Sequence, residues 1–184
     1  MYLFFDTETT GFPAGGPNVH LVQLAWILCD DQGNEKACAD FTVKPSGYTI
    51  PEEVARIHGI TQAIANTEGV PLDNVLSLFS SAVYLSYNLI GHNLDFDDKI
   101  VATEYARVGW DNPMREKTRF CTMKTQAVID YCAILGNNGR YKKPKLMALH
   151  DKLFGHNFEN AHNALYDVRA TAKCFWKLRQ LGLI

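Results

Sequence analysis

The sequence predicts an α/β fold with a mixed sheet of about five strands flanked by helices, in one domain over residues 1–184. Three apolar runs separated by turn residues open the chain, as is typical of an antiparallel meander. From Pro71 onward, helix-like and strand-like segments alternate, which indicates further strands with helices packed on the sheet faces. The 184 residues, 47% of them hydrophobic, suffice for one core and do not demand a second domain.

The opening strands are predicted at 2–5, 19–29 and about 36–44. The first is a short aromatic run that leads straight into Asp6 and Glu8. Residues 30–34, Asp-Asp-Gln-Gly-Asn, supply the turn between the second and third strands. Pro51, followed by two acidic residues, suits the start of a helix that ends near Gly59.

The second half of the chain is predicted to contain a helix at 72–82, a strand at 83–90, a helix at 94–108, a strand near 119–121 and then further helices. The last helix is expected over 163–181, because apolar residues recur there at the spacing of one buried helix face. Residues 136–144 carry Gly, Asn and Lys without periodicity and are interpreted as a mobile loop.

Composition favours a protein of the cytoplasm. No apolar run reaches the roughly 18 residues needed to span a bilayer, and carboxylates occupy the place where a secretory signal would have its cleavage site. Neither membrane contact nor secretion is therefore expected. The five cysteines are widely spaced without a CxxC pair, which indicates neither a disulfide framework nor a thiolate zinc site.

Charge is distributed unevenly along the chain. The formal net charge of −2 argues by itself against a nucleic-acid partner. Residues 107–145, however, hold nine of the 18 Lys and Arg and three of the 20 acids, so this stretch is net +6 and the rest is −8. An acidic part for cations beside a basic part for phosphates fits a nuclease. A merely solvated basic face explains the pattern equally well.

Asp6 and Glu8 lie two residues apart at the end of the first strand, so both side chains leave the same face with backbones about 7 Å apart. One of two carboxylates this close would take up a proton unless a cation neutralised the pair. Two solvated acids are the alternative, which fits poorly beside four apolar neighbours. Oxygen ligands favour Mg²⁺ or Mn²⁺, and zinc is not expected.

Two further clusters are ambiguous alone. Residues 91–98 follow an apolar strand and begin a helix. Their Asn and Asp residues can be explained structurally, because Asn93 could cap the helix and acids in its first turn complement the helix dipole. His162 precedes Asp167 by five residues, and the two converge only if His162 lies before the last helix with Asn163 as its cap. A structural histidine is the alternative there.

In order and spacing, the patterns DxE, HNxxFD and HxAxxD together resemble the DEDD exonuclease superfamily, specifically its histidine-bearing, DnaQ-like DEDDh branch. That branch includes the proofreading epsilon subunit of bacterial DNA polymerase III. Residues 4–11, FFDTETTG, resemble the first motif, residues 92–97 the second and residues 162–167 the third. Residues 57–61 resemble the family segment that packs near the terminal nucleotide. The resemblance covers nearly the whole chain.

The resemblance implies a ribonuclease H-like fold and a metal-dependent exonuclease that releases 5′-mononucleotides from the 3′ end of nucleic acid, with DNA favoured. It assigns His162 as general base and two Mg²⁺ or Mn²⁺ ions to four carboxylates, Asp6, Glu8, Asp97 and Asp167. Asp95 and Asp98 are neighbouring alternatives, but only Asp97 follows a phenylalanine at the motif's spacing.

Substrate contacts are expected from two regions. By resemblance, the backbone at Thr9 and the segment around His58 receive the terminal nucleotide, and Asn93 is expected to bind substrate as well. Residues 140–145 place four cations, among them Lys142, Lys143 and Lys145, around one aromatic ring, a pattern that can track a phosphate backbone and stack a base. A solvated loop is an equal alternative.

Two other functions are compatible with the motifs: an exoribonuclease of the same family that trims RNA ends, and a non-catalytic module that binds nucleic acid or a polymerase. The complete carboxylate set argues against the second. The chain ends soon after its last helix, whereas polymerase-bound epsilon subunits carry a further tail, so a stable DNA polymerase partner is not expected. The sequence does not predict an oligomeric state.

Overall fold

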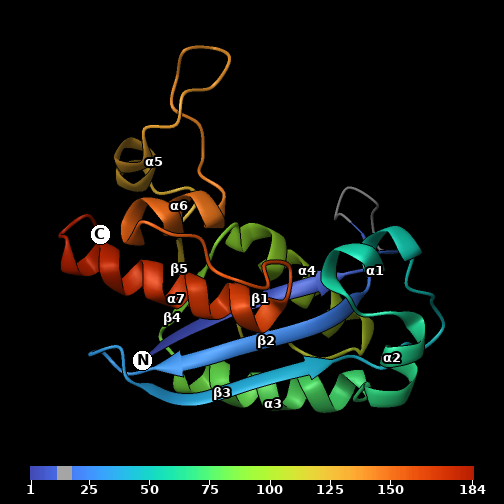
Figure 1. Ribbon diagram of the computed structural model, residues 1–184. Helices are drawn as coiled ribbons and strands as arrows, with labels where there is room; N and C mark the ends of the chain where they lie inside the picture. The colour runs from blue at the N-terminus through green and yellow to red at the C-terminus, as the bar shows by residue number, and fades with distance from the viewer. Residues whose placement is uncertain (12–17) are drawn as a thin grey trace.

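A computed structural model describes residues 1–11 and 18–184 of the chain. Its centre is one five-stranded mixed sheet with the strand order β3-β2-β1-β4-β5 (Figure 1). The strands are β1 (Tyr2–Thr9), β2 (Leu21–Cys29), β3 (Glu35–Thr42), β4 (Asn88–Gly91) and β5 (Thr118–Cys121). The first three pair antiparallel, while β1, β4 and β5 run parallel. The predicted mixed sheet with an antiparallel meander is confirmed.

Helices cover both faces of the sheet (Figure 1). They are α1 (Glu52–His58), α2 (Gln62–Glu68), α3 (Leu72–Leu85), α4 (Leu94–Arg107), α5 (Gln126–Cys132), α6 (Leu146–Phe154) and α7 (Ala164–Gln180). Helix α7 packs on one face and helices α3 and α4 on the other. None of these described helices is long and apolar enough to cross a membrane.

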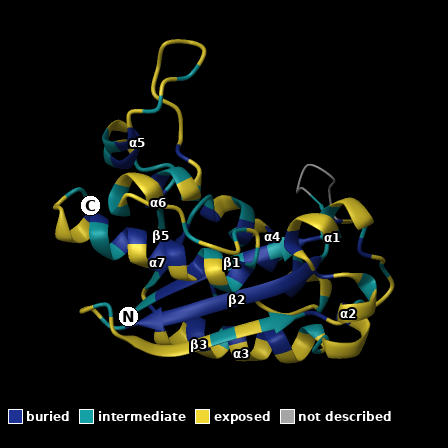
Figure 2. Cartoon of the chain, in the orientation of Figure 1, coloured by how far each residue is buried: buried dark blue, intermediate teal, exposed yellow. Residues whose placement is uncertain are grey.

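Strand β1 anchors both layers because its side chains alternate between the two faces. The Phe4 ring packs 5.3 Å from Phe175 of α7, whereas the neighbouring Phe5 ring packs 5.3 Å from Phe79 of α3. All nine residues of β2 are buried, as its uniform dark blue in Figure 2 shows. Strands β1 and β2 are therefore packed between helices on both faces of the sheet, and they support the side chains of Asp6 and Glu8, which follow Phe5 on β1.

Three predicted boundaries differ from the structure. The first strand continues past residue 5, because Asp6 and Glu8 still pair with β2 while Thr7 and Thr9 are buried. Asp6 and Glu8 thus lie near the end of the first strand, as predicted, and the strand is longer than its apolar run. The predicted strand at 83–90 is wrong over its first half, since α3 continues through Leu85 and β4 begins only at Asn88.

Helix α2 was not predicted. It has only seven residues, of which Ala65 alone is buried, so it carries no apolar periodicity. Its start is nevertheless marked by Thr61, whose hydroxyl accepts a hydrogen bond from Ile64 N at 3.2 Å.

Residues 134–145, here called the finger, project from the body of the protein beyond α5 and α6 (Figure 1). Gly136 N donates to Arg140 O at 2.8 Å and Lys142 N to Ile134 O at 2.9 Å, which closes the segment into a small hairpin. The predicted loop therefore has internal hydrogen bonds, and its mobility stays a prediction.

Candidate active site

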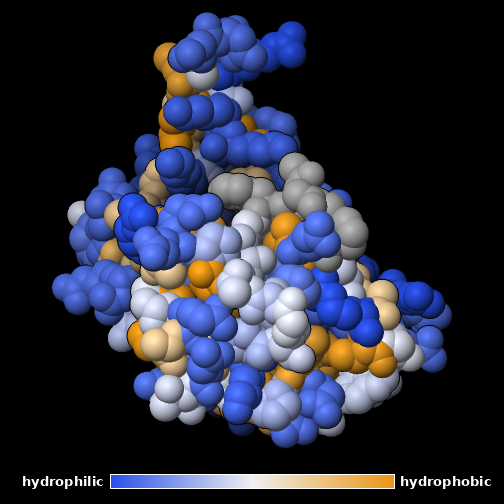
Figure 3. All heavy atoms as spheres, turned by 90° about the vertical axis from the view of Figure 1, so that its right-hand side faces the viewer, coloured by the Kyte–Doolittle hydropathy of each residue, from blue (hydrophilic) through white to orange (hydrophobic). Residues whose placement is uncertain are grey.

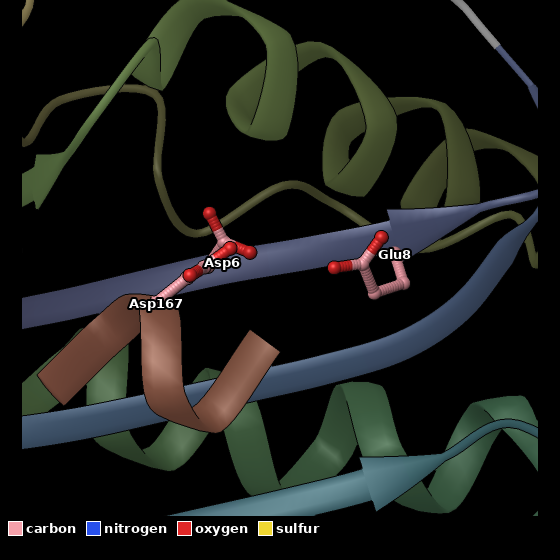
Figure 4. A group of neighbouring side chains, drawn as sticks. All are labelled: Asp6, Glu8 and Asp167. Atoms are coloured by element: carbon pink, nitrogen blue, oxygen red, sulfur yellow. The ribbon is translucent and has the colours of Figure 1, made fainter. Parts of the chain in front are cut away.

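Asp6 and Glu8 leave β1 on the face covered by α7. Their partners on β2 are Ala25 and Gln23. Helix α7 begins above this point, and Asp167 lies one turn inside it. Figure 4 shows the carboxylate of Asp167 reaching from the helix toward the strand that carries Asp6 and Glu8. One carboxylate oxygen from each of the three lies within 4.8 Å of the others, close enough to share a cation.

Asp97 enters from the first turn of α4. Its Oδ1 accepts hydrogen bonds from Thr7 N at 3.0 Å and from Thr7 Oγ1 at 2.7 Å. Strand β4 pairs with β1 only as far as Phe4 and Ile90, so Asp97 satisfies a backbone N–H that lies beyond the last strand pair. The Asp97 carboxylate is thereby fixed beside Asp6 at the end of the parallel pairing.

The neighbouring acids of α4 point elsewhere. Asp95 forms an ion pair with Lys124, and Asp98 forms one with Arg119 at 3.1 Å. Neither alternative lines the cavity that Asp97 shares with Asp6. Geometry therefore separates Asp97 from the two acids that the sequence left as alternatives.

The capping prediction for Asn93 is wrong. Asn93 occupies the N-cap position of α4, but its backbone is left-handed, with φ of 77°, and its side chain makes no capping hydrogen bond. Asparagine tolerates this conformation better than most residues. Its side chain is thus not used by the helix and lines the cavity.

His162 precedes α7, the arrangement in which it and Asp167 were expected to converge. Its backbone is left-handed, with φ of 69°, and its N–H donates to Asp167 Oδ2 at 3.2 Å. Asn163 caps the helix by accepting from Leu165 N at 3.2 Å. The second carboxylate oxygen of Asp167, Oδ1, is buried without any hydrogen-bond partner, and a buried acceptor of this kind suits a cation ligand.

All five residues line one cavity of about 440 Å³. Thr9, His58 and Asn93 line it as well, whereas Lys142, Lys143 and Lys145 do not. His58 is buried, and its Nδ1 accepts from Ile60 N at 3.1 Å, so the ring proton belongs on Nε2. Among the described residues Nε2 makes no hydrogen bond of ordinary length and angle, but the backbone of Thr9 lies close enough to the ring to offset part of the lowering of its pKa by burial. A larger cavity of about 780 Å³ flanks α7 elsewhere and includes none of these residues.

Burial raises the pKa of every carboxyl group in the cluster, and repulsion by neighbouring acids raises the pKa of Asp6, Glu8 and Asp97 further. Burial, followed by the charges of Asp97, Asp167 and Glu8, raises the pKa of Asp6 well above its ordinary value. Burial is also the first cause of the raised pKa of Glu8, to about 8, of Asp97, to about 7, and of Asp167, to about 6. Without a cation, the cluster therefore retains protons near neutral pH.

Two residues that hold the site together had no predicted role. His92 Nε2 donates to Pro144 O at 3.0 Å, so its Nδ1 accepts from Thr122 Oγ1 at 2.9 Å. This bond ties the base of the finger to the junction of β4 and α4. Gln23 Oε1 accepts from Ala164 N at 3.1 Å. A lone glutamine within an apolar strand was the available signal for Gln23, whereas nothing local indicated the partner of His92.

Comparisons with known proteins agree with this arrangement. A family model described as Exonuclease (RNase_T) matches residues 3–175. No curated protein is significantly similar in sequence. Solved structures are similar: E. coli exonuclease I with a dT13 oligonucleotide at 25% identity and a TM-score of 0.79, its zinc-bound complex with single-stranded DNA at 23% and 0.77, and exonuclease I of Methylocaldum szegediense at 22% and 0.80.

These structures cover 99%, 99% and 97% of the chain, respectively. In return, the chain spans 42%, 41% and 40% of theirs. The likeness therefore concerns one region of longer proteins, with which this chain shares its fold.

Changing Glu8 tests the electrostatics of the cluster. An acid whose pKa is raised on folding loses stability as pH rises, because between its unfolded value near 4.5 and about 8 the folded state must keep a proton that the unfolded chain releases. In EDTA, Glu8→Gln should therefore gain in melting temperature relative to wild type as the pH rises from 4.5 to 8, by about 2–4 °C for each kcal/mol that burial of the charge and its repulsion by Asp167 and Asp97 cost the wild type.

The measurement is the thermal midpoint of both proteins at the two pH values. Glu68→Gln, which changes an exposed glutamate at the end of α2, is the matched control and should shift neither midpoint appreciably. An unchanged difference between Glu8→Gln and wild type at both pH values would show that the Glu8 carboxylate is not repelled.

Proposed function

The chain belongs to the exonuclease family, and from this premise we propose that it is a metal-dependent 3′-to-5′ exonuclease that releases 5′-mononucleotides from DNA. One observation carries the proposal: four carboxylates and a histidine from three distant segments line a single cavity. Two of the carboxylates come from β1, one from α4 and one from α7. The histidine immediately precedes α7.

The donor set suits two divalent cations. Asp6, Glu8 and Asp167 would hold one, for which the unpartnered Oδ1 of Asp167 is available. Asp6 and Asp97 would serve the second. The oxygen-only set favours Mg²⁺ or Mn²⁺. When bound, such ions supply Lewis acidity, which lowers the pKa of an attacking water and stabilises charge on the departing 3′ oxygen.

His162 would act as the general base that takes a proton from the attacking water. Its backbone is held against Asp167, and its side chain is exposed at the cavity, where it can meet both substrate and solvent. An imidazole exchanges a proton near neutral pH more readily than any other side chain. The bond to Asp167 thus serves to place the base beside the carboxylate that holds the cation.

The 3′-terminal nucleotide would occupy the part of the cavity lined by Thr9, His58 and Asn93. His58 offers a buried imidazole there, beside the backbone of Thr9. E. coli exonuclease I has been solved with single-stranded DNA, which supports DNA as the substrate here. An exoribonuclease of the same family is the competing assignment.

The finger would hold the strand that leads to this nucleotide. Arg140, Lys142, Lys143 and Lys145 are exposed, and no ion pair with any described acid is present for them. The surface of the finger is mainly hydrophilic with one hydrophobic flank (Figure 3). Because His92 bonds to Pro144 O, the base of the finger is tied to the edge of the cavity. This tie supports a role of the finger in contacting phosphates of the substrate strand.

Digestion of 5′-labelled single-stranded DNA and RNA tests the activity. With Mg²⁺ or Mn²⁺ we expect a ladder that shortens from the 3′ end and disappears in EDTA, and a faster reaction on DNA. Zn²⁺ belongs in the comparison because a relative binds it. A folded protein that gives no ladder with any metal would favour a non-catalytic binding module.

Two acids of α4 provide a matched test within that assay. Asp97→Ala should abolish the ladder, since it removes a buried carboxylate of the cavity. Asp95→Ala removes an exposed carboxylate two residues away and should leave cleavage near the wild-type rate. Equal loss in both variants would contradict the assignment of Asp97.

His162→Ala should lower kcat by about 10²- to 10⁴-fold, because general-base catalysis typically contributes that much. The measurement is kcat against pH from about 5 to 8, where the variant should also lose the rise that an imidazole base produces. His156→Ala, at an exposed histidine outside the cavity, is the control. An unchanged kcat would remove His162 from the mechanism.

Lys142→Ala combined with Lys143→Ala tests the finger. KM should rise with kcat little changed, and the slope of log KM against log salt should fall by about 0.7 for each phosphate that the protein no longer neutralises. Lys173→Ala combined with Lys177→Ala removes two cations from α7, away from the cavity, as a control. If both double variants behave alike, the finger does not contact the substrate.

A further inference from the structure

Gln23 is a polar residue in an otherwise apolar place. Strand β2 has the sequence LVQLAWILC, and all nine of its residues are buried. Gln23 itself is only 4% exposed. It is the cross-strand partner of Glu8, so its side chain lies on the same face as the metal-binding carboxylates and under the start of α7.

Both ends of the Gln23 amide are used. Its Nε2 donates to Asp40 Oδ1 at 2.7 Å, and its Oε1 accepts from Ala164 N at 3.1 Å. The orientation is unambiguous, because an ionised carboxylate only accepts and a backbone N–H only donates. The amide therefore connects β3, through β2, to the first residue of α7.

The start of α7 has few other directional ties to the sheet. Leu165 N bonds to Asn163 Oδ1 and Asp167 N to Asn163 O, both within the same segment. Among the described residues, the bond from Ala164 to Gln23 is the one buried hydrogen bond between the first turn of α7 and a strand. Farther along the helix, Arg169 pairs with Glu35 of β3 at 3.5 Å and Trp176 bonds to Cys29 of β2. Apolar packing also holds the helix but is not directional. The hydrogen bond thus fixes where along the sheet the helix begins.

We propose that Gln23, oriented by Asp40, is a positioning residue that sets the distance of Asp167 and His162 from Asp6 and Glu8. Ala164 lies two residues after His162 and three before Asp167, so a shift of the helix start moves both groups. Displacements of about 1 Å suffice to reduce turnover strongly. The proposal rests on the proposed function, since the positioned groups are the cation ligands and the base.

The hydrogen bond between Gln23 and Asp40 can be tested by exchanging which of the two residues donates and which accepts. Gln23→Met removes both hydrogen bonds while nearly conserving volume. Gln23→Glu alone sets two carboxylates against each other, and Asp40→Asn alone weakens the bond. In Gln23→Glu with Asp40→Asn, the new amide can donate to the new carboxylate, whose other oxygen still accepts from Ala164 N, and net charge is unchanged.

The readouts are kcat and KM on single-stranded DNA and, independently of activity, Mn²⁺ affinity by calorimetry. Gln23→Met should lower kcat and Mn²⁺ affinity by about 10- to 100-fold, as is typical when a residue that orients a metal site is removed, with KM little changed. The double variant Gln23→Glu with Asp40→Asn should recover most of the wild-type kcat and most of the wild-type Mn²⁺ affinity. Gln62→Met removes a similar bond, from Ile50 N at 2.8 Å, on α2, and should change neither quantity.

Wild-type kcat and Mn²⁺ affinity in folded Gln23→Met would overturn the proposal. If Gln23→Met fails to fold, the double variant Gln23→Glu with Asp40→Asn provides the test. A kcat and a Mn²⁺ affinity close to those of the wild type support the positioning role of Gln23. Values as low as those of Asp40→Asn alone overturn it. An inactive wild-type protein would refute the proposed function instead. Mn²⁺ affinity would then still test whether Gln23 sets the geometry of the carboxylates.

Discussion

The crowding of four carboxyl groups, of which Asp97 is buried and Asp6, Glu8 and Asp167 are half-buried, is the constraint around which the structure is arranged. Each of them has a raised pKa, and burial is the first cause for all four. Such a cluster is unfavourable in isolation and persists only where the surrounding fold is strong enough to hold it. The aromatic layers on both sides of β1 provide that strength, since Phe4 and Phe5 are almost completely buried just before the first acid.

The four acids are held in place by different contacts. Asp6 and Glu8 are fixed by strand pairing with β2, and Asp97 by two hydrogen bonds from Thr7. Asp167 is held by the first turn of α7 and by the backbone of His162. These contacts are hydrogen bonds and strand pairing, and among the described residues none of the four acids forms an ion pair with Lys or Arg. The carboxylate charges are therefore left for a ligand of opposite sign.

The sequence contained much of this arrangement, because strands and helices have fixed periods. A strand period of two places Asp6 and Glu8 on one face, and the family motifs indicate which distant residues join them. Local pattern could not decide where α3 ends, since the apolar residues up to Leu85 suit a strand as well as a helix. The left-handed backbone of Asn93 could not be predicted for a similar reason. Asparagine is favoured as a helix cap and also tolerates positive φ, so the residue type is compatible with both arrangements. The bonds of Gln23 and His92 join segments far apart in the chain, so only the assembled fold shows them.

The position of α7 in the chain has a consequence for biosynthesis. Asp6, Glu8 and Asp97 emerge from the ribosome well before His162, which precedes the last helix of the described chain, and Asp167, which lies within it. The sheet can pair while the cluster still lacks its third shared ligand, so the repulsion is lowest during the early stages of folding. Docking of α7 then completes the cluster in a single late step. A nascent chain would thus have no complete cation site until its core is already in place.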